Sequence, residues 1–151
     1  MKIALMLILI FAAYNCSVGA ARPQSSDLLG RWKIEITFGD QSKRSLSFDA
    51  EDSDTGSLLL EAQSNWDEPA KPSRAKLTVG KDKRVTILAT VEFPIGNVGR
   101  ETGVLALKGS FKSEKIITGD IAFYPMDQDP MDPNATPTKT GKFEATRVRG
   151  N

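Results

Sequence analysis

Residues 29–38 read Leu-Gly-Arg-Trp-Lys-Ile-Glu-Ile-Thr-Phe and carry the clearest strand pattern in the chain. The apolar residues Trp32, Ile34, Ile36 and Phe38 fall on one face of a two-residue period, and polar residues lie between them. This alternation predicts a strand that is buried on one face and exposed to water on the other.

The first 20 residues have the pattern of a secretory signal peptide. Lys2 is followed by an apolar run over residues 3–13 and then by small residues that end at Ala20. The run is shorter than the roughly 20 residues that span a bilayer. We therefore expect a signal peptide at 1–20, one barrel domain at 21–151, a secreted or periplasmic location and no transmembrane span.

Cys16 raises the alternative of an acylated lipoprotein cysteine. The residues that precede it, Ala13, Tyr14 and Asn15, are not the aliphatic and small residues that such processing sites favour. The sequence therefore disfavours a lipid anchor at Cys16.

The composition excludes several classes of function. The chain has no histidine, and its one cysteine lies in the predicted signal peptide. These absences exclude Ser-His-Asp and Cys-His nucleophile systems and most zinc and copper sites. Removing Lys2 with the signal leaves equal numbers of basic and acidic residues, so no basic surface for nucleic acid is predicted. We expect no enzyme activity, no cofactor and no nucleic-acid partner.

Seven further segments show strand patterns, and turn residues separate most of them. Gly119 in the seventh strand is expected to mark a bend or bulge. Residues 94–100 are expected to form a glycine-spaced loop. The eight predicted strands are 29–38, 43–50, 57–62, 74–79, 84–93, 103–111, 115–124 and 141–149.

Eight short strands joined mainly by tight turns predict an all-β fold with antiparallel up-and-down order. Eight strands suffice to close a small barrel, and closure removes the exposed edges of a sheet. The alternative is a two-sheet β-sandwich.

Two short motifs resemble those of the calycins, the superfamily that contains lipocalins and avidins. The motifs are Gly30-Arg31-Trp32 on the first strand and Arg147 on the last, and the ending 143–148 is similar to the last avidin strand. The resemblance implies that Arg147 lies across the Trp32 ring at one end of a barrel, as a structural pair.

The chain departs from the calycin pattern in ways that bear on the ligand. Avidins carry a biotin-binding asparagine two residues after the tryptophan, and Ile34 stands there in this chain. The Thr-Asp-Tyr-like triplet of lipocalins is also absent. The resemblance therefore implies an outlying calycin-like barrel that does not bind biotin.

The leading functional hypothesis is a lipocalin-like, non-catalytic binding protein for a small apolar molecule held in the barrel interior or mouth. The alternative for each candidate is ordinary core packing, which is the commoner arrangement in a barrel of this size. For Trp66 the alternative, again the commoner one, is a cap over the end of the core. The candidate binding residues are Trp32, Ile36, Leu46, Phe48, Ile87, Ala89, Val91 and Trp66.

Three other readings stay open at this stage. One is a protein-interaction module, because secreted metalloprotease inhibitors are similar small barrels that act through an amino-terminal tail, here residues 21–26. Another is an enzyme that uses Glu92 and Asp120 as a carboxylate pair. The third is a calcium site in the aspartate-rich loop from Asp127 to Asp132, although the loop lacks a closing glutamate.

Overall fold

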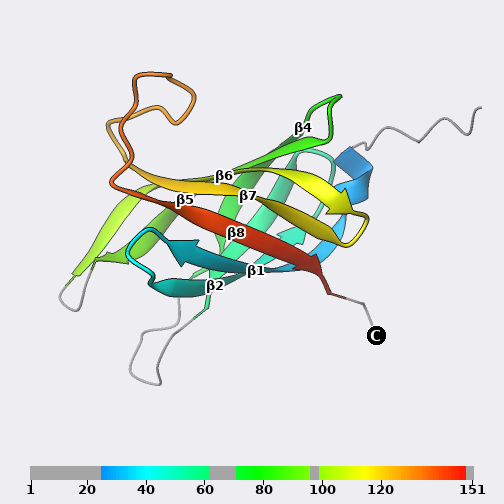
Figure 1. Cartoon of the computed structure of the whole chain (residues 1–151), viewed down its shortest axis with the longest axis horizontal. Helices are drawn as coiled ribbons and strands as arrows, with labels where there is room; N and C mark the ends of the chain where they lie inside the picture. Colours follow the sequence, from blue (N-terminus) through cyan, green and yellow to red (C-terminus); the bar gives the residue numbers. More distant parts are fainter. Residues whose placement is uncertain (1–24, 62–70, 96–98, 149–151) are drawn as a thin grey trace, which may run out of the picture.

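The computed structural model describes residues 25–61, 71–95 and 99–148. Eight antiparallel strands close into one up-and-down barrel, in which β8 pairs with β1 (Figure 1). The predicted all-β barrel is confirmed, and the chain does not form a two-sheet sandwich. The elements are η1 (Ser25–Leu28), β1 (Gly30–Phe38), β2 (Lys43–Ala50), β3 (Thr55–Leu60), β4 (Ser73–Val79), β5 (Arg84–Ile95), β6 (Gly99–Ser113), β7 (Ile116–Pro125) and β8 (Lys139–Arg147).

The largest difference from the predicted strands lies where β5 meets β6. The sequence predicts a loop over 94–100, but Pro94 pairs with Arg100 and Ile95 pairs with Gly99. The predicted loop is therefore wrong at these four positions. The register of a long hairpin extends the ladder through residues whose local preference is for turns.

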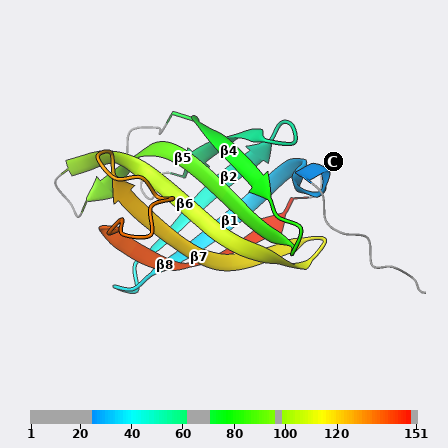
Figure 2. The same cartoon turned by 90° about the horizontal axis from the view of Figure 1, so that it is seen from above.

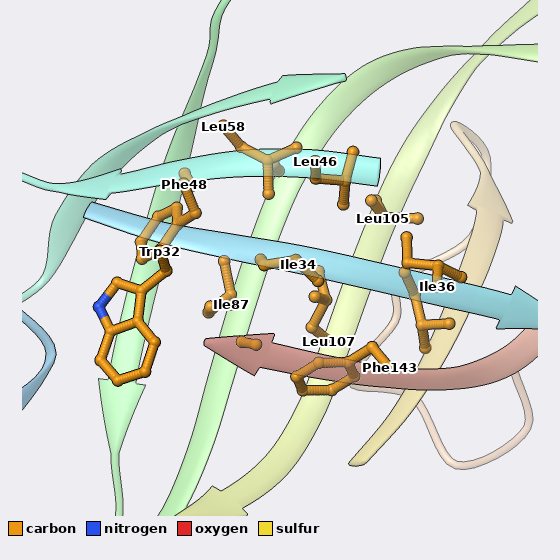
Figure 3. Close-up of a cluster of buried hydrophobic side chains, with 14 of the residues drawn as sticks. Trp32, Ile34, Ile36, Leu46, Phe48, Leu58, Ile87, Leu105, Leu107 and Phe143 are labelled. Carbon is orange, nitrogen blue, oxygen red and sulfur yellow. The ribbon is translucent and has the colours of Figure 1, made fainter. Parts of the chain in front are cut away.

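The core is built from the inward side chains of every strand. Alternate residues along each strand face the barrel interior, as the two-residue period predicts. Figure 3 shows the centre of this cluster, where the side chains come from facing walls of the barrel: Trp32, Ile34, Ile36, Leu46, Phe48, Leu58, Ile87, Leu105, Leu107 and Phe143.

The structure places no bulge at Gly119. The register shift between β6 and β7 lies between Phe111 and Ser113, whereas Gly119 pairs in register with Gly109. A Cβ atom added at Gly119 would lie 2.2 Å from the carbonyl oxygen of Lys108 and 2.4 Å from the Cα atom of Gly109. Glycine is needed there because the two backbones approach closely, not because the strand bulges.

One end of the barrel, the closed end, is covered by η1. Leu28 is fully buried, and its carbonyl oxygen accepts a hydrogen bond from Trp32 Nε1 at 2.7 Å. The Arg147 guanidinium lies 4.6 Å from the centroid of the Trp32 ring. It donates to the carbonyl oxygen of Leu29 at 2.9 Å and to that of Asp27. The implied Trp32–Arg147 pair is therefore present, and it also holds η1 in place.

The sequence predicts an amino-terminal tail over residues 21–26. The structure shows that the last two of these residues are instead part of a short helix. Ser25 and Ser26 belong to η1, while residues 21–24 lie outside the described residues, as does the predicted signal peptide with Cys16. The helix was missed because contacts from β8, more than 100 residues away, hold it. The part of the chain that the structure describes has no helix long and apolar enough to cross a membrane.

We predict that Arg147→Lys lowers the free energy of unfolding by about 1–3 kcal/mol, because lysine keeps the charge but loses the forked donation to two carbonyls. Urea unfolding measures the change. Arg31→Lys is the control, since Arg31 is 67% exposed and its ion pair with Asp49 is a surface one; we expect a change within about 0.5 kcal/mol. Equal effects of the two substitutions would contradict the role of Arg147.

We predict that Gly119→Ala lowers the free energy of unfolding by about 1–3 kcal/mol, because the added methyl group overlaps backbone atoms of β6. Thermal unfolding followed by circular dichroism measures the effect. Gly99→Ala is the matched control in a strand, since nothing lies within 4 Å of a Cβ atom there. A tolerated Gly119→Ala would show that β6 and β7 separate easily.

Candidate functional site

The described candidate residues all face the barrel interior, where they belong to one packed hydrophobic cluster. The Phe48 ring lies so close over Gly56 that a Cβ atom there would be 2.7 Å from the ring. Trp66 lies outside the described residues. The exposed fractions are 1% for Trp32, 1% for Ile36, 0% for Leu46, 1% for Phe48, 3% for Ile87, 2% for Ala89 and 6% for Val91.

A pocket of about 420 Å³ lies toward the opposite end, the open end, where β1, β3, β5 and β7 finish. We call it the β3/β5 pocket. Its apolar wall consists of Leu58, Leu60 and Val91. The remaining lining residues are Lys71, Pro72, Ser73, Thr90, Glu92, Arg100 and Thr102.

The pocket exists because β4 is too short to fill the wall. Pairing of β4 with β3 stops at Leu58, opposite Ser73, and pairing with β5 stops at Ala89, opposite Ala75. β5 nevertheless continues with β6 as far as Ile95. In Figure 2 the β5–β6 hairpin extends past the start of β4. Among the described strands, no ladder therefore joins β3 to β5 over this distance, and we call this interval the split.

The rim of the β3/β5 pocket is charged and polar. Arg100 Nη1 lies 4.0 Å from Glu92 Oε2, and these side chains are 38% and 66% exposed. Lys71 forms no ion pair with any residue in the described ranges. An apolar wall under a rim with a surplus cation suits a ligand that has an apolar body and a polar or anionic group.

Aromatic rings pack inside the barrel at the open end. The ring centroids of Phe38 and Phe93 lie 5.4 Å apart, and those of Phe93 and Phe123 lie 5.3 Å apart. Lys139 Nζ lies 5.2 Å from the centroid of Phe38 and 3.5 Å from Asp40 Oδ2. These contacts pack the ends of β1, β5 and β7 together inside the open end.

The aspartate-rich loop is not organised around a metal ion. Asp129 and Asp132 each accept a hydrogen bond from the backbone N–H two residues further on, at 2.8 Å in both cases. The described residues contain no group of three or more carboxylate, histidine or cysteine side chains that could hold a metal. Lys108 Nζ, on the outer face of β6, donates to the carbonyl oxygen of the buried Pro130 at 3.0 Å, which ties the loop to the barrel wall.

The two carboxylates considered for acid–base catalysis do not meet. Glu92 lies opposite Thr102 of β6, and Asp120 lies opposite Lys108 of the same strand. Six residues along a strand separate them by about 20 Å. Asp120 is instead paired with Lys142. The structure therefore does not bring this pair together.

Sequence reasoning missed most of the pocket. Leu58 and Leu60 belong to the run Leu58-Leu59-Leu60, which lacks the two-residue alternation, and Arg100 was assigned to a loop. Lys71 lies between the predicted strands 57–62 and 74–79, so no strand pattern marked it as a rim residue. No local signal shows where β4 stops pairing with β3 and β5, because that depends on register across the barrel.

No protein-family model matches the chain, and no curated protein matches it. Among solved structures, EF1p2_mFAP2b bound to DFHBI is similar, with a TM-score of 0.54 and 16% identity over 83% of this chain and 96% of that one. A redesigned β-barrel matches at a TM-score of 0.53 and 13% identity, over 87% and 98%. The redesigned barrel mFAP1, also bound to DFHBI, matches at 0.52 and 13%, over 85% and 100%. At this identity the likeness concerns the fold.

We predict that Ile36→Ala lowers the free energy of unfolding of the ligand-free protein by about 2–5 kcal/mol, because it opens a void in a packed core. Urea unfolding measures the change. Leu60→Ala is the comparison, since Leu60 is half-buried at the β3/β5 pocket, and we expect a smaller loss. A loss at Ile36 below about 1 kcal/mol would indicate an interior cavity in place of a packed core.

Proposed function

We propose that this protein is an exported, non-catalytic, calycin-like barrel that binds a small molecule with an apolar body in the β3/β5 pocket. The observation that carries the proposal is the pocket itself. Its volume of about 420 Å³ lies within the range of about 300–1,000 Å³ that is typical of ligand sites.

The arrangement of the two barrel ends supports this proposal. η1 with Arg147 covers the closed end, and Phe38, Phe93 and Phe123 pack together inside the open end. The split between β3 and β5 is then the route by which a molecule reaches apolar core side chains. The proposed ligand site therefore moves from the barrel centre, where the sequence placed it, to the wall at the open end.

Further support comes from the fold and from the sequence. The Trp32–Arg147 contact has the form that the calycin resemblance implies. Two of the similar solved barrels are bound to a small molecule, DFHBI. The pattern at residues 1–20 supports export, and the separation of Glu92 from Asp120 removes the carboxylate pair that an enzyme hypothesis needed.

A second candidate function is a protein-interaction module that acts through its loops. The observation that favours it is the loop between β7 and β8, where Met126 and Met131 are 57% and 62% exposed. Backbone hydrogen bonds from Gln128, Asp132 and Ala135 to residues three positions earlier stiffen this loop. A stiff loop with exposed apolar tips loses little conformational entropy when a partner binds it.

The proposed function predicts that 8-anilino-1-naphthalenesulfonate, an apolar fluorescent anion, binds the folded protein and that Leu60→Trp weakens binding at least tenfold by filling the pocket. Fluorescence titration measures the dissociation constant. Val79→Trp is the matched control, because Val79 is likewise partly buried against the core but lies at the closed end. We expect its dissociation constant to stay within twofold. Equal effects of the two substitutions, or no dye binding, would refute the pocket.

A further inference from the structure

The backbone groups of β5 alternate between its two neighbours. The Gly80 N–H donates to the carbonyl oxygen of Arg84 at 2.7 Å, toward β4, and the Phe111 N–H donates to that of Lys83 at 3.3 Å, toward β6. In an antiparallel ladder this alternation continues along the strand. Even-numbered residues of β5 therefore direct their N–H and C=O groups toward β4, and odd-numbered residues direct theirs toward β6.

At the split, the backbone N–H and C=O groups of the even-numbered β5 residues no longer pair with β4. Ladder pairing of β5 with β4 ends at Ala89, so the N–H and C=O groups of Glu92, which face this side, have no ladder partner in a described strand. Pro94 belongs to the same set and has no N–H to donate. Proline within a strand is confined to positions where the ladder does not need that donor, so Pro94 independently marks this side of β5 as an edge.

The facing strand presents the same kind of edge. The Leu77 N–H donates to the carbonyl oxygen of Asp54 at 2.7 Å, so even-numbered residues of β3 direct their backbone groups toward β4. Leu58 still pairs with Ser73, but Leu60 has no partner in β4. Two strand edges thus face each other across the β3/β5 pocket.

The two strand edges, the apolar wall and the charged rim together indicate which kind of ligand the β3/β5 pocket can bind. An extended peptide supplies donors and acceptors at the spacing that a strand edge requires, and its side chains point alternately to the two faces. One face meets the apolar wall of Leu58, Leu60 and Val91, and the other meets the rim. Lys71 is the rim charge that forms no ion pair with a described residue, so a carboxylate is the complementary group.

We propose that the β3/β5 pocket binds an extended peptide segment by strand addition to the edge of β5, with an apolar side chain against Leu58, Leu60 and Val91 and a carboxylate facing Lys71. This inference rests on the proposed function, because it names the class of ligand that the same pocket holds.

The test uses the blocked peptide acetyl-Glu-Ile-Glu-Ile-Glu-amide and the full purified chain, with isothermal titration calorimetry as the measurement. We expect saturable binding of this peptide. We also expect at least a tenfold weaker affinity for the same peptide N-methylated at all three glutamates. This change keeps every side chain but removes the donors that face β5, because the outward-facing residues of β4 direct their backbone groups to that strand. The Lys-Ile-Lys-Ile-Lys analogue is expected to bind more weakly than the acidic peptide.

A substitution in the protein tests the same hydrogen bonds by changing the edge of β5 instead of the peptide. Glu92→Pro removes a donor that faces the split and leaves the β5–β6 ladder intact, because Glu92 directs no hydrogen bond toward β6. We expect at least a tenfold loss of peptide affinity relative to Glu92→Gln. Glu92→Gln is the matched control because it loses the same rim charge but keeps the N–H. If Glu92→Pro does not fold, the N-methylated peptide on the unaltered protein still decides the question.

The outcomes separate this inference from the function on which it rests. Dye binding at the pocket with no peptide binding, or with equal affinity for the N-methylated peptide, overturns strand addition and leaves the small-molecule pocket standing. Absence of both dye and peptide binding overturns the proposed function as well.

Discussion

The pairing of β1 with β8 is the constraint on which the rest of the structure depends. It runs in register from Trp32 opposite Arg147 to Phe38 opposite Gly141, and it joins the two ends of the strand order. Closure gives both outer strands a partner and turns one face of all eight strands into a single interior. It also places Arg147 across Trp32, so the closed end follows from the same register.

The two ends of the barrel are closed by similar chemistry to different extents. At the closed end a guanidinium lies over an indole and holds the carbonyls of η1. At the open end Lys139 lies over Phe38, while β4 stops short of filling the wall between β3 and β5. A cation over an aromatic ring stabilises both ends, but only at the second end does ladder pairing of the described strands stop short, and the proposed site lies there.

Much of the architecture followed from the sequence, and most of the site did not. Alternation identified eight strands, and the Trp32 and Arg147 motifs identified the pair at the closed end. The loop predicted over 94–100 was wrong because proline and glycine were read as turn residues, whereas Pro94 marks a strand edge and Gly99 continues the ladder. Leu60, Lys71 and Arg100 could be assigned to the β3/β5 pocket only from the three-dimensional arrangement of the strands.

In the strands with clear alternation, the sequence by itself determined which side chains share the buried face, because a strand turns successive residues to opposite faces whatever its neighbours are. It also determined what the chain lacks, namely histidine and, after residue 16, cysteine. Only the tertiary structure decided where the wall is open, where η1 lies and which carboxylates remain far apart. These features depend on the register between strands distant in the sequence, which is set by hydrogen bonds and packing across the whole barrel.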